Sequence, residues 1–148
     1  MALGQIIVST NHVSYTVVDM LRALRLFTQL LSAEVLSHAR AANVEGIRGM
    51  TGLDVESLEI AFVQLGEQRI ELLQFAPSKS EVQLSANTPG FAHLAITVSD
   101  LDAFLIEAGR FELVPIGSSM KMLGGSDVGK RAIYLRSPDA IVVEAIGA

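Results

Sequence analysis

The sequence predicts an α+β protein made of two tandem βαβββ modules whose sheets join around a cleft. Module one is expected at about residues 6–76 and module two at about residues 90–148 of a single domain that spans residues 1–148. Two observations lead to this prediction. A strand-like segment, an aspartate and an amphipathic segment occur twice at a fixed interval, and each copy is followed by short strand-like runs.

The first copy of the pattern begins at residues 11–18. Small or polar residues alternate there with larger apolar ones, which predicts a strand with His12, Ser14 and Thr16 on one face. Asp19 follows at a position typical of a helix N-cap. Apolar residues then recur at spacings of three and four, which predicts an amphipathic helix packed on the other face of the strand through Met20, Leu21, Leu24, Phe27 and Leu31.

The second copy occupies residues 92–101, where His93, Ala95 and Thr97 share one strand face and Asp100 is the expected cap. The interval from the first copy's histidine to His93 is 81 residues, and the same interval separates the two aspartates. A shared interval for the histidine and the cap is poorly explained by chance. It therefore indicates a duplicated module.

Each half also ends in a predicted hairpin. In the first half the strands are residues 58–65 and 69–75, with a turn at Gly66-Glu67. In the second half they are residues 131–135 and 141–146, with a turn at residues 137–139, and a polar linker at residues 76–90 joins the halves. A βαβββ unit leaves one sheet face uncovered, so two units side by side are expected to enclose the cleft.

Composition excludes several kinds of function. The chain has no cysteine, so any metal must be bound through nitrogen and oxygen. Its 16 acidic and 11 basic residues give a net charge of −5 without a basic run, and nucleic acid is not an expected partner. The apolar run at residues 6–8 is too short for a signal peptide or a membrane span, which predicts a cytoplasmic protein without a membrane partner. The mean hydropathy of +0.43 is high for a small monomer, so we expect a homodimer.

A candidate metal site comes from two histidines and two glutamates. Glu71 and Glu144 each fall among apolar residues near the middle of the last strand of their half, where an unpaired carboxylate would cost several kcal/mol to desolvate. His12 and His93 fall early in the first strands, and all four side chains point to the concave face if the sheets join as predicted. Two imidazoles and two carboxylates suit one divalent ion of Zn, Ni, Co, Mn or Fe, with room left for water or a small-molecule substrate. No organic cofactor is expected.

Each of these residues has a simpler interpretation when taken alone. A single histidine in a strand is more often a packed, hydrogen-bonded residue than a ligand, and a single glutamate often lies on a solvated edge. The metal interpretation rests on two matched His…Glu pairs, separated by 59 and 51 residues. His38 lies outside the repeat, and we expect it on the surface or at a pocket edge on the next strand.

The glycine-rich segment Gly124–Lys130 is superficially similar to a phosphate-binding loop. Arg131 stands where that motif needs serine or threonine, and a strand follows where a helix should. We therefore expect a mobile loop beside the cleft. Lys130 and Arg131 are either solvated charges or groups that meet an anionic substrate.

The sequence resembles the glyoxalase, bleomycin-resistance and extradiol-dioxygenase superfamily, also called vicinal oxygen chelate proteins. The resemblance covers nearly the whole chain and rests on Asn11-His12-Val13, Val18-Asp19-Met20, Arg69–Leu73, Gly90–Ala95, Val98-Ser99-Asp100, Tyr134–Asp139 and Val143-Glu144. It implies that His12, Glu71, His93 and Glu144 ligate a divalent metal, an order similar to bacterial glyoxalase I and close to methylmalonyl-CoA epimerase. The chain departs from the family at two turns, because Leu31-Ser32 lacks the usual glycine and Ala140 replaces the glycine of the usual Asp-Pro-Asp-Gly turn.

These observations favour a metal-dependent lyase or isomerase of the glyoxalase or epimerase type, which stabilises an enolate or enediolate of a small carbonyl substrate. Glu144 or Glu71 would be the catalytic base, and the resemblance favours Glu144. Single-domain Fe(II) dioxygenases and thiol transferases of the fosfomycin-resistance kind are alternatives that normally need only three protein ligands. A further alternative is a non-catalytic binding or resistance protein that holds a small molecule in the cleft.

Overall fold

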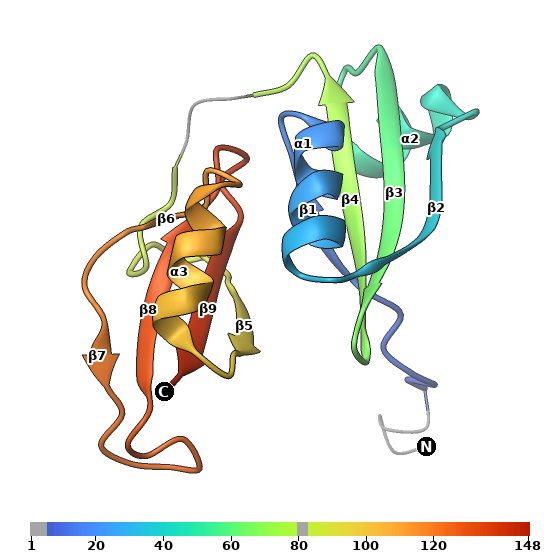
Figure 1. The fold of residues 1–148 in the computed structure, drawn as a ribbon. Coiled ribbons are helices and arrows are strands. Elements are labelled where there is room, and N and C mark those ends of the chain that lie inside the picture. Colours follow the sequence, from blue (N-terminus) through green and yellow to red (C-terminus); the bar gives the residue numbers. More distant parts are fainter. Residues whose placement is uncertain (1–5, 80–82) are drawn as a thin grey trace. The chain divides into compact units, whose positions relative to one another are not determined.

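The computed structural model describes residues 6–79 and 83–148 (Figure 1). Residues 1–5, at the N-terminus, and residues 80–82, in the predicted linker, lie outside the described residues. Contacts within the chain define two compact units. The first contains the chain up to Thr16 and from Met20 to Pro77, and the second contains Val17–Asp19 and the chain from Ser78 onward.

The first unit is a four-stranded mixed sheet with one helix packed on it. Strand β1 (Val13–Thr16) runs parallel to β4 (Gln68–Ala76), β4 runs antiparallel to β3 (Ser57–Leu65), and β3 runs antiparallel to β2 (Glu34–Arg40). The strand order is β1-β4-β3-β2. The connection from β1 to β2 contains α1 (Met20–Arg25) and the π-helical turn η2 (Leu26–Leu30). The predicted hairpin at residues 58–75 is therefore confirmed, with each strand slightly longer than expected.

The buried stripe of the first helix is narrower than its apolar pattern predicts. Met20, Ala23 and Phe27 are at most 1% exposed, whereas Leu21 is 72% exposed. Successive helical residues are rotated by about 100°, so Leu21 is turned away from the stripe that the other three define. The assignment of Leu21 to the packed face was wrong. The helix then widens into η2, whose last turn closes with the Leu31 N–H donating to the Leu26 carbonyl oxygen at 3.1 Å.

A second helix of this unit, α2 (Val44–Thr51), was not predicted. Its end signals are present in the sequence. The Asn43 side chain accepts a hydrogen bond from the Gly46 N–H at 2.8 Å, and Gly52 takes the left-handed conformation, with φ of 70°, at the C-cap. None of its residues is buried. The apolar residues Val44, Ile47 and Met50 recur at a spacing of three, but a helix of 8 residues gives this pattern too few turns to be recognised in a sequence.

The second unit repeats the plan of the first. Strand β5 (Leu94–Thr97) runs parallel to β9 (Val142–Gly147), which is antiparallel to β8 (Arg131–Arg136); β8 also pairs with the short strands β6 (Val114–Pro115) and β7 (Met120–Lys121). The order β5-β9-β8-β6 matches β1-β4-β3-β2 position by position. Helix α3 (Leu101–Gly109) begins at Asp100, whose carboxylate accepts a hydrogen bond from the Ala103 N–H at 2.9 Å. The predicted βαβββ architecture, the second hairpin and the Asp100 cap are confirmed.

The cores of both units lie between the helix and one face of the sheet. In the first unit this face carries Ala61, Val63, Ile70 and Leu72, and in the second it carries Leu135, Val143 and Ala145, all of which are fully buried. Because strand side chains alternate, the residues between them lie on the opposite face of each sheet. Glu71 and Glu144 are on that opposite face. No helix in the described part of the chain is both long and apolar enough to cross a membrane.

Candidate metal centre

In the first unit the structure brings His12 and Glu71 together. Ser14 of β1 is in register with Glu71 of β4, and His12 lies two residues before Ser14. The His12 Nε2 atom is 3.2 Å from the Glu71 Oε2 atom. The side chains are 30% and 16% exposed, respectively, so both remain partly accessible. His12 lies immediately before β1 instead of inside the strand, which corrects the expected strand start.

The second unit repeats this arrangement with His93 and Glu144. Ala95 of β5 is in register with Glu144 of β9, and His93 lies two residues before Ala95. The His93 Nε2 atom is 2.9 Å from the Glu144 Oε2 atom, and the two side chains are 32% and 20% exposed. His93 also directly precedes its strand. The two pairs therefore match in register, in contacting atoms and in exposure.

An aromatic side chain lies opposite each glutamate on the neighbouring hairpin strand. Phe62 is in register with Glu71, and its ring meets the His12 ring edge-on, with 5.3 Å between centroids. Tyr134 is in register with Glu144, and its ring centroid is 4.9 Å from that of His93. The Phe91 ring centroid is 6.3 Å from that of His93 and 6.3 Å from that of Tyr134. These aromatic residues were not predicted as part of the site, because the strand register decides which residue lies across a hairpin from each glutamate.

The two histidines are oriented by different neighbours. The His12 Nδ1 atom is 2.6 Å from the Asn11 Oδ1 atom, a contact that fits a proton on Nδ1 because an amide oxygen accepts. With the proton on Nδ1, the Nε2 atom that faces Glu71 would be free to bind a metal, an arrangement common among metal-binding histidines. His93 instead lies beside two aromatic rings, those of Phe91 and Tyr134. A hydrogen bond thus orients the His12 imidazole, whereas contacts with aromatic rings orient that of His93.

The donor chemistry of each pair fits a divalent metal of borderline hardness, because it offers one imidazole nitrogen and one carboxylate. Each pair supplies only two donors. Within residues 6–79 and 83–148, no group of three or more His, Asp or Glu side chains is arranged to hold an ion. The structure therefore brings the four sequence-predicted ligands together as two pairs.

His38 also contacts a glutamate. It lies on β2, exposed as expected, with its Nε2 atom in contact with the Glu59 carboxylate. Glu59 was not predicted as its partner. Glu59 is in register with Gln74, whose side-chain oxygen accepts a hydrogen bond from the Met20 N–H of α1, so this contact lies on the helix-bearing face.

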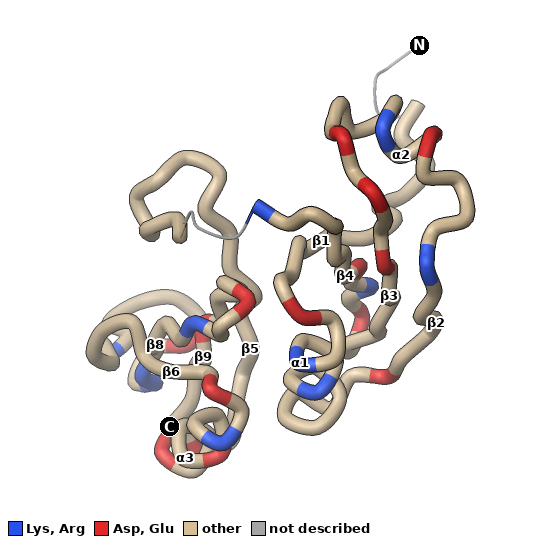
Figure 2. The backbone as a smooth tube through the Cα atoms, turned by 90° about the horizontal axis from the view of Figure 1, so that it is seen from above, with Lys and Arg blue, Asp and Glu red and all other residues tan. Residues whose placement is uncertain are grey.

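The cations of the glycine-rich loop have partners within the chain. The Lys130 ammonium is 2.7 Å from the Asp127 carboxylate, and the Arg131 guanidinium is 3.1 Å from Asp102. The hydrogen bond to Asp102 raises the pKa of Arg131 above its ordinary value. Basic and acidic positions are interspersed along the described chain (Figure 2). These contacts favour the solvated-charge interpretation of Lys130 and Arg131.

A different arginine lies beside the first His–Glu pair. Arg69 places its guanidinium carbon 4.5 Å from the centre of the Phe62 ring. Together with His12, Asn11 and Gln68 it lines a cavity of about 510 Å³. Arg69 was not predicted as part of the site, because only the tertiary structure reveals that it covers the Phe62 ring.

Three comparisons show what the chain is similar to. The sequence pattern of the glyoxalase/bleomycin resistance protein/dioxygenase superfamily matches residues 11–121. The chain is 31% identical over 148 aligned residues to a 2-epi-5-epi-valiolone epimerase from an Actinomyces species, covering 94% of this chain and 79% of that relative. A solved structure of a glyoxalase family protein from Bacillus cereus superposes with a TM-score of 0.79 at 22% identity, covering 99% of this chain and 97% of the other.

A fosfomycin resistance protein, FosX from Mesorhizobium loti, superposes with a TM-score of 0.59 at 16% identity, covering 95% of this chain and 91% of the other. At such identities the structural matches establish the shared fold, and the sequence match establishes the family. Three findings indicate the same family: the two βαβββ units, the paired histidines and glutamates, and the match over residues 11–121. The chain belongs to the glyoxalase/bleomycin resistance protein/dioxygenase superfamily.

Proposed function

We propose that the protein is a metal-dependent isomerase of the epimerase type, which moves a proton at a carbon next to a carbonyl group. The observation that supports this most strongly is the equivalence of the His12–Glu71 and His93–Glu144 contacts, which occupy the same register in both units. The 31% identity to an epimerase over 94% of the chain favours isomerisation over the lyase chemistry of glyoxalases.

We propose that His12, Glu71, His93 and Glu144 together ligate one divalent ion of Zn, Ni, Co, Mn or Fe. Two donors from either pair alone are too few, since protein sites for such ions commonly use three or four protein ligands. The partial exposure of all four side chains leaves their donor atoms accessible to an ion and to a small substrate. When bound, the ion would polarise the carbonyl oxygen and lower the free energy of the enolate.

The proton transfer falls to the chain's own carboxylates. Glu144 is the proposed base, and it removes the proton from the carbon next to the carbonyl group. Epimerisation also requires a proton to return to the opposite side of that carbon. Glu71 is the proposed donor, because it is the matching carboxyl of the other unit; to carry the proton it would be released from the metal when substrate binds, since metal ligands must be deprotonated. Tyr134 and Phe91 lie beside His93, and we expect their rings to limit the access of water to Glu144.

The proposed substrate is a small ketone, as the name of the epimerase relative indicates. The test uses metal-loaded protein in deuterated water with 2-epi-5-epi-valiolone, alongside hemithioacetals and acyl thioesters as alternative carbonyl substrates. We expect metal-dependent deuterium uptake next to the ketone, accompanied by inversion at that carbon. In Glu144→Gln, kcat should fall by about 100-fold or more with a smaller change in KM, because glutamine keeps the shape but not the basicity.

His38→Ala is the matched control, since this histidine also contacts a glutamate but lies on the helix-bearing face. It should leave exchange unchanged. Undiminished uptake in Glu144→Gln would exclude Glu144 as the base. Metal binding without label uptake from any carbonyl substrate would instead favour a non-catalytic binding protein.

A further inference from the structure

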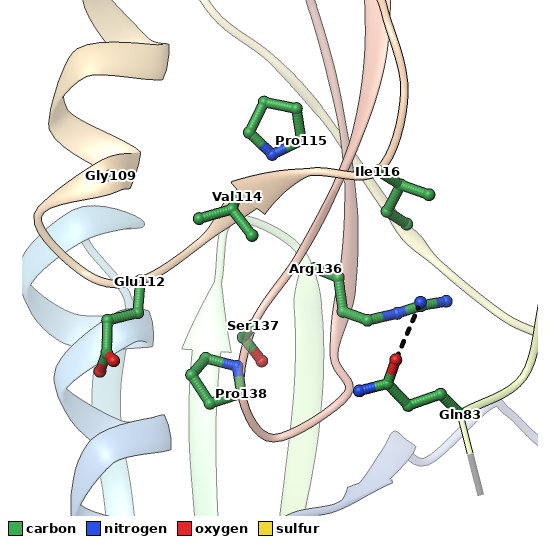
Figure 3. A pocket seen from close by; sticks show the side chains of 9 residues that line it. All are labelled: Gln83, Gly109, Glu112, Val114, Pro115, Ile116, Arg136, Ser137 and Pro138. Carbon is green, nitrogen blue, oxygen red and sulfur yellow. Dashed lines mark hydrogen bonds between the residues drawn. The ribbon is translucent and has the colours of Figure 1, made fainter.

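The second unit contains a cavity of about 640 Å³ that includes neither of the His–Glu pairs (Figure 3). It lies where the end of α3, strand β6 and the turn after β8 meet. Its walls are largely apolar at Val114, Pro115, Ile116 and Pro138. The cation in its lining is Arg136, at the last position of β8.

Arg136 is a partly buried cation whose hydrogen-bond partners among the described residues are neutral. One terminal nitrogen donates to the Gln83 side-chain oxygen at 3.3 Å, and the other donates to the Leu84 carbonyl oxygen at 2.6 Å. Among the described residues, its Nε is a buried nitrogen without a hydrogen-bond partner. Removing a charge from water without a counter-ion costs several kcal/mol. Arg136 is therefore electrostatically under-compensated.

The other arginines of this unit differ in this respect. Arg131 pairs with Asp102 at 3.1 Å and Arg110 pairs with Glu107 at 3.0 Å. Glu112 lines the same cavity as Arg136, but Figure 3 shows its carboxylate on the far side of Val114 from the guanidinium. No ion pair joins Arg136 to an Asp or Glu within the described part of the chain. An acceptor with negative charge is what the guanidinium lacks.

The position of Arg136 on strand β8 determines the direction in which its guanidinium extends. Arg136 follows Tyr134 by two residues, so both side chains leave β8 on the face that carries Glu144. In Figure 3 the guanidinium extends from this strand toward the Gln83 amide, with Ile116 beside it. The Gln83 contact is the longer of the two hydrogen bonds, and Gln83 is exposed, so its amide oxygen is readily displaced. A carboxylate or phosphate in its place would form a stronger, charge-assisted hydrogen bond.

We propose that this cavity binds a small organic oxyanion, with Arg136 as the charge partner and the apolar wall in contact with the body of the ligand. Carboxylates and phosphate monoesters share the required chemistry, since both present oxygen pairs that match the guanidinium. The proposal does not depend on the metal site or on epimerase activity. Its test therefore needs neither a metal nor a carbonyl substrate.

The experiment follows the arginine side-chain Nε–H signals of the full chain by NMR, together with the backbone amide signals of Val114 and Ile116, which line the cavity and remain as reporters when Arg136 is replaced. Sodium phosphate and sodium benzoate are titrated in separate arms, and sodium chloride at matched ionic strength is the baseline. We expect the chemical shift of the Arg136 signal to change and to reach a plateau as ligand is added. The titration with the lower dissociation constant identifies phosphate or carboxylate as the preferred group. Arg136→Gln should weaken the apparent affinity by about tenfold or more, whereas Arg110→Gln, an exposed arginine of the same unit, should not change it.

Two results would overturn the proposal. The first is a shift that does not saturate or that chloride reproduces. The second is equal affinity in wild type and Arg136→Gln. If Arg136→Gln does not fold, Gln83→Ala provides the test. This substitution removes the amide that competes with the ligand for Arg136, so the affinity for the ligand should equal or exceed that of wild type. A weaker affinity would contradict the proposal.

Discussion

His38 contacts Glu59 on the face of the first sheet opposite to that of Glu71. Glu59 lies three residues before Phe62, the residue in register with Glu71, and strand side chains alternate between faces. The sequence contains three histidines, so the second unit has no histidine left to form a matching pair. His38–Glu59 is thus an imidazole–carboxylate contact without a duplicate, and it provides an internal control for the proposed metal ligands.

Replacing His93 by alanine should lower the affinity for a divalent metal by at least about tenfold. The physical reason is the loss of a nitrogen donor, while the folded core does not depend on a side chain that is 32% exposed. Equilibrium dialysis followed by elemental analysis measures the affinity, and circular dichroism verifies folding. Wild type should bind about one ion per chain.

The control for this measurement is His38→Ala, which should bind metal as wild type does. Glu71→Gln should behave like His93→Ala, because an amide is a weaker ligand than a carboxylate. Tight binding retained in both His93→Ala and Glu71→Gln would remove these residues from the ligand set.

Ala140→Gly should raise the free energy of unfolding by about 1 kcal/mol. Ala140 has φ of 61°, and its N–H donates to the Ser137 carbonyl oxygen at 3.0 Å in the turn between β8 and β9. A Cβ atom is strained in this left-handed conformation, and glycine relieves the strain. Urea denaturation measures the change. Ala39→Gly, within β2, is the control and should lower stability instead; a loss of stability in Ala140→Gly would contradict the argument.

Stability should decline at alkaline pH in part because of Tyr15. Burial raises the pKa of Tyr15 above its ordinary value of about 10 by disfavouring the phenolate. Between the unfolded and folded pKa values the folded protein holds more protons, so this contribution is fully present below the unfolded pKa and is lost as pH rises through the folded pKa. Tyr15→Phe should therefore flatten the alkaline part of a plot of unfolding free energy against pH.

A direct measurement of the Tyr15 pKa is available because the chain has only two tyrosines. In Tyr134→Phe, the ultraviolet absorbance of tyrosinate reports Tyr15 alone. A midpoint at or below the ordinary value would contradict the predicted effect of burial.

Asp139→Ala should lower the free energy of unfolding by about 2 kcal/mol or more. One carboxylate oxygen of Asp139 accepts hydrogen bonds from the Val18 and Asp19 N–H groups at 2.9 and 2.8 Å, and the residue is 3% exposed. Removing the carboxylate leaves two partly buried donors without this acceptor. Asp54→Ala, at a side chain that is 99% exposed, should change stability by less than about 0.5 kcal/mol. Equal urea midpoints for the two variants would show that the Asp139 hydrogen bonds contribute nothing net.

The duplicated architecture was readable from the sequence because its signals are local. Alternation marks both hairpins, and the 81-residue interval between His12 and His93 marks the repeat. Helix α2 was missed although its caps at Asn43 and Gly52 are local signals too, because its 8 residues are too few for the periodic apolar pattern to stand out. Leu21 was misassigned because apolar character alone does not fix the rotation of a helix against its sheet.

The candidate ligands were also chosen from the sequence, as glutamates in apolar strands and histidines at matched places. The contacts that give them meaning depend on strand register. His12 meets Glu71 across 59 residues of chain because β1 pairs parallel to β4, and Tyr134 lies opposite Glu144 because of the register between β8 and β9. That all four side chains ligate one ion stays a prediction.

By itself, then, the sequence determined the α+β class, the two modules and the residue types of the candidate site, since periodicity and repetition can be read along the chain without knowing which strands pair. Only the tertiary structure decided which aromatic ring lies beside each histidine, that His38 faces away from Glu71, and that Arg136 is partly buried with neutral partners. These features depend on pairings between residues far apart in the chain. Whether a side chain is buried, and which charge it meets, depends on such long-range neighbours. The sequence alone does not show which distant residues become neighbours.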